Sequence, residues 1–343
     1  MVNASSVVSS APLAIASYCM SSILMTVTNK VVLSSYDFKL NFLLLGIQSI
    51  LCVLTLQLFV KFNMANHRKF NLADARAWFI VSFALVAMIY TGSKALQYLP
   101  IPLFTIFKNI TIIIIAYSEE AFFHGSPVTR LMLLSFTLMV CSSIIAGWAD
   151  LSSGSLQKKS EDIGYFVSYS WMIANCLTTA TFALTMKAKI KDVGFKDFDT
   201  VFFNNLISIP ILAFAFLATE TSKVMPLYER YFSSTSTESG FGLLLGIFIS
   251  GVSSFGISYS TAWCMRVTSS TTYSMVGALN KLPIAVAGWI FFSDPVSFGG
   301  VLGVAIAFVA GIVYSHAKNV QKKAAAALPK ADYLPVPTKG VKT

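Results

Sequence analysis

Long apolar runs, separated by short polar links, dominate the pattern of this sequence. A helix needs about 20 apolar residues to cross the ~30 Å hydrocarbon core of a bilayer. Runs of that length occupy residues 12–33, 40–60, 77–97, 102–123, 131–149, 164–186, 200–219, 241–262, 268–292 and 299–317. The pattern therefore predicts an all-α integral membrane protein with ten transmembrane helices.

Composition supports this prediction. The chain of 343 residues is 55% hydrophobic and 12% charged, and its mean hydropathy is +0.70. A soluble domain would carry about 25% charged residues, so lipid is the solvent for most of this chain. The net charge of +10 does not indicate nucleic-acid binding, because the basic residues lie mostly in the links and the C-terminal tail.

The distribution of lysine and arginine predicts that both termini are cytosolic. With an even number of spans the termini share one side of the membrane, and that side receives most of the 25 basic residues. The opposite side receives Lys39, Lys158, Lys159, Lys223 and Arg230. Since cytoplasmic links carry the excess of basic residues, we expect the N-terminal segment 1–11 and a basic, disordered tail at 318–343 to lie in the cytosol.

Two short patterns recur in the same order in the two halves of the chain. Tyr36-Asp37-Phe38 precedes the second run, and Lys196-Asp197-Phe198 precedes the seventh. A Phe-Phe pair followed by Pro-Val closes the fourth run at residues 122–128 and the ninth at residues 291–296. Each pattern alone is weak, but their matching order indicates two five-helix repeats.

An odd number of spans in each repeat inserts the second copy upside down. This is the inverted-repeat architecture of secondary transporters, in which the substrate site lies near the midplane between the halves. We expect repeats at residues 12–149 and 164–317, joined by a linker at 150–163.

Four lysines fall inside or at the edge of the predicted spans: Lys30, Lys94, Lys108 and Lys281. A charge at the bilayer centre costs about 2.5–3.5 kcal/mol on insertion scales. Lys30 and Lys94 are close enough to span ends for their ammonium groups to reach the interface. Lys108 and Lys281 lie deeper, where they either face a wet cavity that attracts an anion such as phosphate, reach the interface, or pair with a carboxylate.

Adjacent amides stand in the seventh run, in Phe202-Phe203-Asn204-Asn205. Each asparagine offers two donors and an acceptor, and successive helical residues point about 100° apart. The amides could bind a neighbouring helix, a common use of polar residues in membranes. They could equally bind a flat ligand with donors and acceptors on one edge, such as a nucleobase.

The ninth run places Tyr273, Gly277 and Lys281 on one helical face, at positions i, i+4 and i+8. A ring, a gap and a cation along that face suit a ribose and its pyrophosphate. Small residues such as Gly277 and Ala278 are also ordinary helix-packing positions in membranes.

With these residues assembled, the sequence resembles the nucleotide-sugar transporters of the drug/metabolite transporter superfamily, and among them the fungal Golgi GDP-mannose transporters. The two signatures of that family are FYNN and GALNK. They correspond here to Phe202-Phe203-Asn204-Asn205 and to Gly277-Ala278-Leu279-Asn280-Lys281. The resemblance extends over nearly all of the predicted membrane region.

The resemblance implies a single cavity for a nucleotide sugar, lined by Tyr18, Lys108, Asn175, Asn204, Asn205, Ser258, Tyr273, Gly277 and Lys281. In the family the two motif asparagines recognise guanine, a serine assists them, and the face with the GALNK lysine holds the ribose and phosphates. The tyrosine that corresponds to Tyr18 lies near the sugar. Two departures stand out, since Phe203 replaces the tyrosine of FYNN, and Phe104 stands where the family often has a tyrosine reaching toward the sugar.

The resemblance also implies a function and its setting. We expect a multi-pass Golgi protein that exchanges cytosolic GDP-mannose for lumenal GMP by alternating access, without a cofactor or metal and without enzymatic activity. Membrane lipids and a second copy of the chain, as a homodimer, are the expected partners, and nucleic acid is not. Alternatives are a transporter of GDP-fucose, of another nucleotide sugar or of a phosphorylated metabolite, and a membrane-embedded glycosyltransferase.

Overall fold

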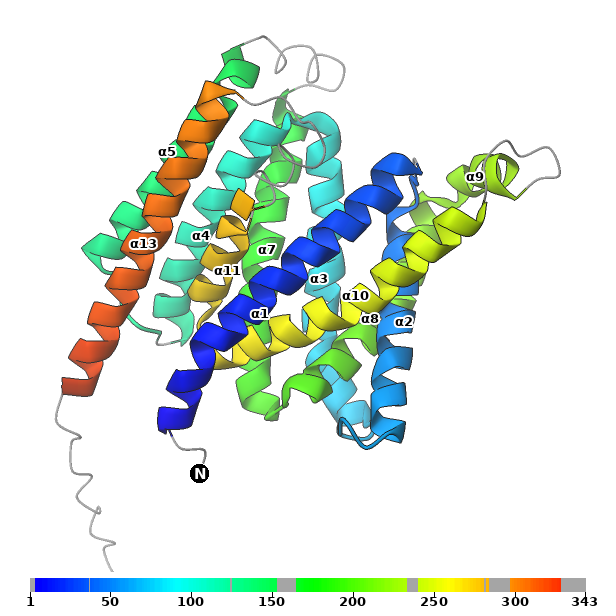
Figure 1. Cartoon of the computed structure of the whole chain (residues 1–343), viewed down its shortest axis with the longest axis horizontal. Coiled ribbons are helices and arrows are strands. Elements are labelled where there is room, and N and C mark those ends of the chain that lie inside the picture. Colours follow the sequence, from blue (N-terminus) through cyan, green and yellow to red (C-terminus); the bar gives the residue numbers. More distant parts are fainter. Residues whose placement is uncertain are drawn as a thin grey trace, which may run out of the picture.

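The protein is seen in a computed structural model that describes residues 4–36, 38–123, 125–152, 165–232, 240–280, 282–283 and 297–327. Within these ranges the chain is helical and contains no strand (Figure 1). The elements are α1 (Ala4–Lys30), a π-helical turn η1 (Val31–Ser35), α2 (Asn41–Lys61), α3 (Leu72–Tyr98), α4 (Ile101–Phe123), α5 (Arg130–Ser152), α7 (Tyr165–Val193), α8 (Asp197–Thr219), η2 (Thr221–Lys223), α9 (Val224–Tyr231), α10 (Gly240–Val267), α11 (Ser270–Leu279) and α13 (Phe298–Ala327).

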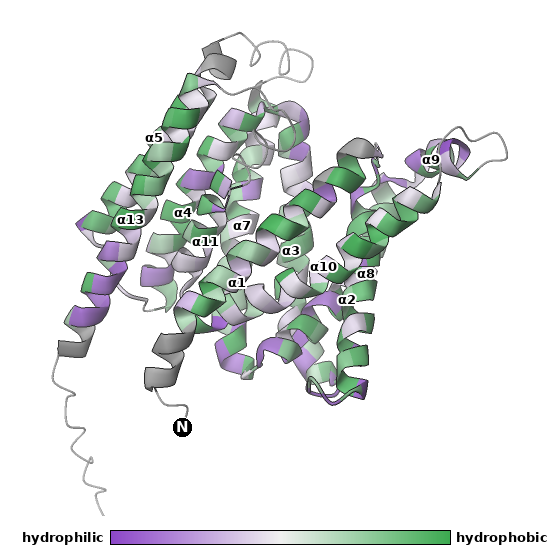
Figure 2. Cartoon of the chain, in the orientation of Figure 1, coloured by the Kyte–Doolittle hydropathy of each residue, from purple (hydrophilic) through white to green (hydrophobic). Residues whose placement is uncertain are grey.

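Eight of the described helices are long and apolar enough to cross a membrane: α1, α2, α3, α4, α5, α8, α10 and α13. Hydrophobic residues cover their outward faces as well as their inward ones (Figure 2). Phe298, Phe166 and Phe241 are 85%, 84% and 75% exposed, and many other large hydrophobic side chains are exposed as well. Soluble proteins rarely expose so large an apolar surface. The chain is an integral membrane protein with a helical fold.

The remaining two predicted spans differ from the other eight. The run at 164–186 forms α7, whose mean hydropathy is lowered by Asn175 and several threonines in its middle. The run at 268–292 begins with α11, and most of the rest of it lies outside the described residues.

Helices extend beyond several of the predicted ends. α1 begins at Ala4, and α13 continues through the first ten residues of the segment expected to be a disordered tail. The physical reason is local, because the stretch Lys322-Lys-Ala-Ala-Ala-Ala327 favours helix although it is not apolar enough to count as a span. The long link at 220–240 holds η2 and α9, which the apolar pattern did not predict.

The helices pack in four principal pairs: α1 with α10, α3 with α7, α2 with α8, and α5 with α13. α2 also packs on α10, and α3 on α8, so these helices form one continuous bundle. α5 and α13 form one edge of the molecule, with α4 and α11 beside them (Figure 1). Both α4 and α11 thus lie between the edge pair and the rest of the bundle.

Polar side chains join the helices inside the bundle. Gln48 Nε2 of α2 donates to Asn29 Oδ1 of α1 at 2.9 Å and to Ser250 Oγ of α10 at 2.6 Å. Ser250 Oγ in turn donates to Asn29 Oδ1 at 2.7 Å. Such bonds are the usual substitute for hydrophobic association between helices in lipid.

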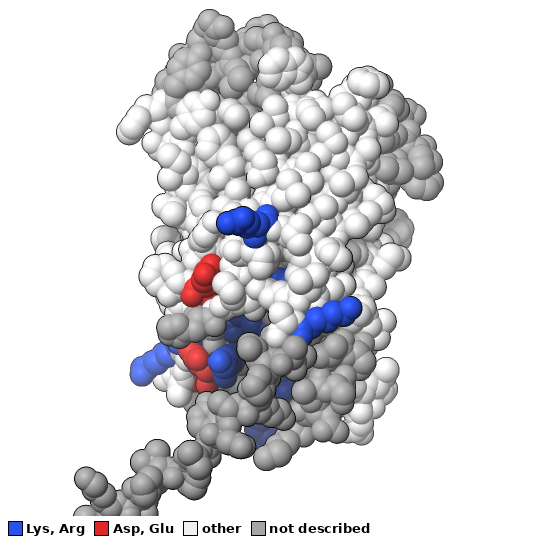
Figure 3. Space-filling model, turned by 90° about the vertical axis from the view of Figure 1, so that its left-hand side faces the viewer, with Lys and Arg blue, Asp and Glu red and all other residues white. Residues whose placement is uncertain are grey.

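The charged side chains gather toward one end of the bundle, drawn as the lower end in Figure 1. The upper part of the face in Figure 3 carries no Lys, Arg, Asp or Glu among the residues described there. The links α2–α3, α7–α8 and α10–α11 all lie at the lower end (Figure 1). These links and the helix ends beside them carry nine of the basic residues that the sequence placed on the cytosolic side.

Candidate substrate site

The predicted site residues that the structure describes lie on α1, α4, α7, α8, α10 and α11. They form three local groups, in which α8 meets α10, α1 meets α11, and α4 meets α7. Lys281, the predicted phosphate-binding lysine, lies outside the described residues, so its placement stays a prediction.

Asn205 and Ser258 form the first group, where α8 faces α10. Asn205 is buried, and its Nδ2 donates to Val201 O at 2.9 Å and to Ser258 Oγ at 3.4 Å. No described residue donates to Asn205 Oδ1, which leaves this carbonyl oxygen as an acceptor. The structure therefore brings together two residues that lie 53 positions apart in the sequence.

Asn204 is held by a residue that the sequence did not indicate. The indole Nε1 of Trp78, on α3, donates to Asn204 Oδ1 at 3.3 Å. The backbone oxygen of Asn204 accepts from Ser208 Oγ at 2.7 Å and from Ser82 Oγ at 3.4 Å. A lone tryptophan six residues into an apolar helix carries no motif that could have identified this contact.

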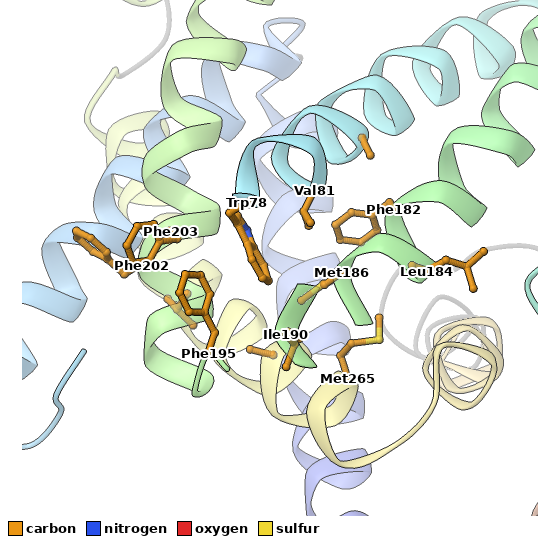
Figure 4. Packing of buried hydrophobic residues seen from close by; sticks show 14 of the residues in the cluster. Trp78, Val81, Phe182, Leu184, Met186, Ile190, Phe195, Phe202, Phe203 and Met265 are labelled. Carbon is orange, nitrogen blue, oxygen red and sulfur yellow. The ribbon is translucent and has the colours of Figure 1, made fainter. Parts of the chain in front are cut away.

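The two phenylalanines of the motif belong to an aromatic cluster (Figure 4). Phe203 is fully buried, 4.8 Å from the ring of Phe195 and 6.2 Å from that of Phe70. Phe202 stacks on His67, with ring centroids 4.2 Å apart. The hydroxyl that distinguishes FYNN from this sequence would therefore enter a packed apolar environment.

Tyr18, Tyr273 and Gly277 form the second group. The rings of Tyr18 on α1 and Tyr273 on α11 lie 5.0 Å apart. A methyl group at position 277 would lie 3.2 Å from the hydroxyl of Tyr18, so the missing side chain at Gly277 gives the phenol its space. The glycine thus serves the close approach of α1 and α11.

Lys108 and Asn175 form the third group. Lys108 Nζ donates to Thr179 Oγ1 at 2.7 Å and lies 5.5 Å from the centre of the Phe104 ring. Thr179 Oγ1 donates to the backbone oxygen of Asn175 at 2.6 Å. Asn175 is fully buried, and its Nδ2 donates to Met88 O at 2.8 Å. Within the described part of the chain its Oδ1 has no hydrogen-bond partner.

The other residues of the GALNK motif pack toward α13. Ala278 and Leu279 contact the buried cluster that includes Met275 and Tyr314. Asn280 is 3% exposed, and its Nδ2 finds no partner among the described residues. A buried amide with an unused donor is uncommon, and this one immediately precedes the predicted phosphate-binding lysine.

A carboxylate from α4 holds the start of α11. Glu119 Oε1 accepts from Ser270 N at 3.0 Å, and Oε2 accepts from Thr271 N at 3.0 Å and from Thr271 Oγ1 at 2.6 Å. Negative charge at a helix N-terminus is stabilising. Glu119 therefore sets the position of the helix that carries Tyr273 and Gly277.

Two more charged side chains make hydrogen bonds between helices at the lower end of the bundle. Arg266, near the end of α10, donates to both carboxylate oxygens of Asp197 on α8, at 2.6 and 2.8 Å. Lys187 of α7 donates to the carbonyl oxygens of Met265 at 2.7 Å and of Arg266 at 3.1 Å, and also to that of Thr268. A cation at a helix C-terminus satisfies its last carbonyl groups.

A cavity of about 180 Å³ lies apart from the predicted site, where α2 begins and α3 and α8 end. Lys94, Lys223 and Glu220 line it, and Lys94 Nζ is 6.0 Å from the centre of the Tyr90 ring. The Oε1 and Oε2 atoms of Glu220 accept from the N–H of Phe42 at 3.1 and 3.0 Å, which caps α2.

The described residues contain no cluster of three or more His, Cys, Asp or Glu that could hold a metal.

Comparison with known proteins identifies the family. The chain is 52% identical over 311 residues to the GDP-mannose transporter of Schizosaccharomyces pombe, covering 91% of this chain and 88% of that protein. The chain belongs to the GDP-mannose transporter family. The family protein of Komagataella pastoris is 50% identical over 94% of this chain and 95% of its own, and that of Yarrowia lipolytica 49% over 95% and 99%. These relatives are transporters, and the chain is accordingly not an enzyme.

The other comparisons bear on the fold alone. No family model matches the chain. One crystal structure, described only as that of a protein, superposes with a TM-score of 0.65 over 88% of this chain and 97% of its own, at 10% identity. At that identity the likeness concerns the arrangement of the helices.

Proposed function

We propose that this protein carries GDP-mannose across the Golgi membrane into the lumen in exchange for GMP, by alternating access. The observation that carries the proposal is the pair of amides at Asn204 and Asn205, with Ser258 beside them, in the signature position of a family whose members are named GDP-mannose transporters. Both termini would lie in the cytosol, and the lower end of the bundle would be the cytosolic end.

The chemistry of the two amides complements guanine. With Asn204 Oδ1 bound to Trp78, the Nδ2 of Asn204 is left as a donor, and Asn205 Oδ1 is left as an acceptor. Guanine presents O6 as an acceptor and its N2 amino group as a donor. One asparagine can therefore donate to O6 while the other accepts from the N–H side of the base.

The remaining contacts follow from the other two groups. Tyr273 and Gly277, with Lys281 four residues later in the sequence, would hold the ribose and phosphates. Tyr18 lies against Tyr273, so a sugar beside Tyr18 would be next to the ribose and its pyrophosphate. Lys108 would add positive charge from α4. Because GDP-mannose and GMP share the base, the ribose and a phosphate, both can occupy one site in both orientations of the carrier.

The pairing of the helices supports two inverted five-helix repeats. If each helix matches the one five spans later, the pair α1–α10 corresponds to α7–α3, and α2–α10 corresponds to α8–α3. Both members of each correspondence occur. We assign the repeats to residues 12–149 and 164–317 with a linker at 150–163, an N-terminal segment at 1–11 and a basic tail from 318. Alternating access then follows from rocking of the repeats about a central site, and a homodimer is the proposed assembly.

Exchange in reconstituted vesicles tests the proposal. Vesicles loaded with GMP should take up GDP-mannose, and unlabelled GMP should compete whereas UMP and CMP should not. Asn204→Ala and Asn205→Ala should each impair exchange of GDP-mannose and of GMP alike, because both ligands carry guanine. Gln57→Ala is the control, since this amide is exposed and, among the described residues, bonds only to His67, at 3.1 Å.

Three results would point elsewhere. Competition by UMP or CMP in place of GMP would refute the guanine assignment. Uptake of GDP-fucose at the same rate as GDP-mannose would favour a transporter with a broader substrate range. Release of free GDP with a glycosylated acceptor, and without uptake, would favour a glycosyltransferase.

A further inference from the structure

Trp78 is a buried aromatic residue whose single polar atom contacts the proposed base site. Its side chain is fully buried in the apolar cluster of α3, α7 and α8, 5.1 Å from the ring of Phe195 (Figure 4). A buried indole N–H almost always has a hydrogen-bond partner. Here the partner is Asn204 Oδ1, at 3.3 Å.

This contact determines which end of the Asn204 amide faces away from Trp78. In the observed orientation the carbonyl oxygen meets the indole N–H, and the NH2 group points elsewhere. If the amide turned by 180°, its NH2 would face the indole N–H and leave a buried donor unsatisfied. The cost of an unsatisfied buried donor favours the observed orientation by roughly 5-fold to 150-fold.

The other described neighbours do not constrain the amide. Ser208 and Ser82 both donate to the backbone oxygen of Asn204 and leave its side chain free to rotate. Among the described residues, Trp78 alone bonds to the Asn204 side chain. The rotation of this amide therefore depends on one atom, Nε1 of Trp78.

We propose that Trp78 is a specificity-determining positioning residue that makes the carrier select 6-oxopurine over 6-aminopurine nucleotides. It holds the Asn204 carbonyl, so the NH2 group is presented to the base. An NH2 group donates to O6 of guanine, but it opposes the N6 amino group of adenine, since both are donors. The inference rests on the proposed function, in which Asn204 contacts the base.

The test measures how GMP, IMP and AMP inhibit GDP-mannose exchange in reconstituted vesicles. IMP retains O6 and N1–H and lacks the N2 amino group, so it reports on the 6-oxo edge without the N2 contact. In the unmodified protein GMP and IMP should inhibit far better than AMP. In Trp78→Phe the half-inhibitory concentrations of GMP and IMP should rise by about 5-fold to 10-fold, as expected for the loss of one orienting hydrogen bond, and that of AMP should not rise.

Two further variants separate orientation from packing. Ser82 also contacts Asn204, but its hydroxyl donates only to the backbone oxygen. The Ser82→Ala variant should therefore keep the GMP to AMP preference of the unmodified protein. Site-specific replacement of Trp78 by 3-benzothienylalanine exchanges the N–H for sulfur and keeps the fused ring. This variant should reproduce the loss of preference seen in Trp78→Phe with the core still filled.

The outcomes distinguish this inference from the proposed function. If Asn204→Ala abolishes GMP inhibition but the benzothienyl variant keeps the GMP to AMP preference within about twofold, Trp78 does not orient the base reader, and guanine binding stands. An equal change in Ser82→Ala would also overturn the inference. If GMP does not inhibit the unmodified protein, the proposed function itself is wrong.

Discussion

Removal of the Glu119 carboxylate is expected to loosen the start of α11. This side chain is the only described link from α4 to the first-turn N–H groups of α11, and it bonds to Ser270 and Thr271. Both of those residues are buried, at 1% and 3% exposure. Water therefore cannot readily replace the carboxylate once it is removed.

The magnitude follows from the bonds that are lost. Glu119→Ala removes two backbone N–H bonds and one hydroxyl bond to a charged acceptor, and a hydrogen bond to a charged group contributes about 1.5–3 kcal/mol. The start of α11 keeps its own cap, because Ser269 Oγ accepts from Thr272 N at 3.1 Å. We therefore expect a net local loss of about 2–4 kcal/mol for Glu119→Ala. Glu119→Gln retains one acceptor oxygen and should lose about half as much.

Hydrogen exchange of the backbone amides at residues 270–273 is the direct assay, since it reports the local opening free energy. Glu119→Ala should accelerate their exchange by on the order of 30-fold or more. Glu120→Gln is the matched control, because Glu120 bonds to Val128 N at 3.0 Å and not to α11. Unchanged exchange at 270–273 in Glu119→Ala, or equal acceleration in Glu120→Gln, would refute the assigned cap.

Two further predictions concern packing and the sugar. Gly251→Ala should lower the apparent unfolding temperature, at a cost of about 1–3 kcal/mol, because the new methyl group would lie within 2.9 Å of Leu51 Cβ on α2. Gly46→Ala has nothing within 4 Å of the new methyl group, so thermal unfolding should show no loss. Tyr18→Ala should reduce uptake of GDP-mannose more than of GMP, and equal losses in a two-substrate exchange assay would contradict the sugar position.

The sequence indicated candidate site residues but not the side chains that contact them. The family resemblance placed Asn204, Asn205 and Ser258 in one site, and the structure brings Asn205 and Ser258 within 3.4 Å. Spacing also suggested both a packing and a ligand role for Gly277, and the structure shows its close approach to Tyr18. The contacts of Trp78 and Glu119 were not predicted, because neither residue belongs to a recognisable pattern.

What the sequence by itself determined is the solvent and the secondary structure. The length of an apolar run is a local property of the sequence. In lipid, a single run of this length can satisfy its backbone N–H and C=O groups only by forming a helix. The helix ends were less predictable, as the extension of α13 to Ala327 shows, because a helix can continue into water after the apolar run has ended.

The tertiary structure alone decided which side chains meet. Trp78 and Asn204 are separated by 126 residues, and Glu119 and Ser270 by 151. No periodicity connects such positions, since their meeting depends on how α3 packs on α8 and α4 on α11. The interpretation of Phe203 changed for the same reason. In the sequence it stood out because it lacks the hydroxyl of the family's tyrosine, whereas in the fold its ring is buried against Phe195 and Phe70.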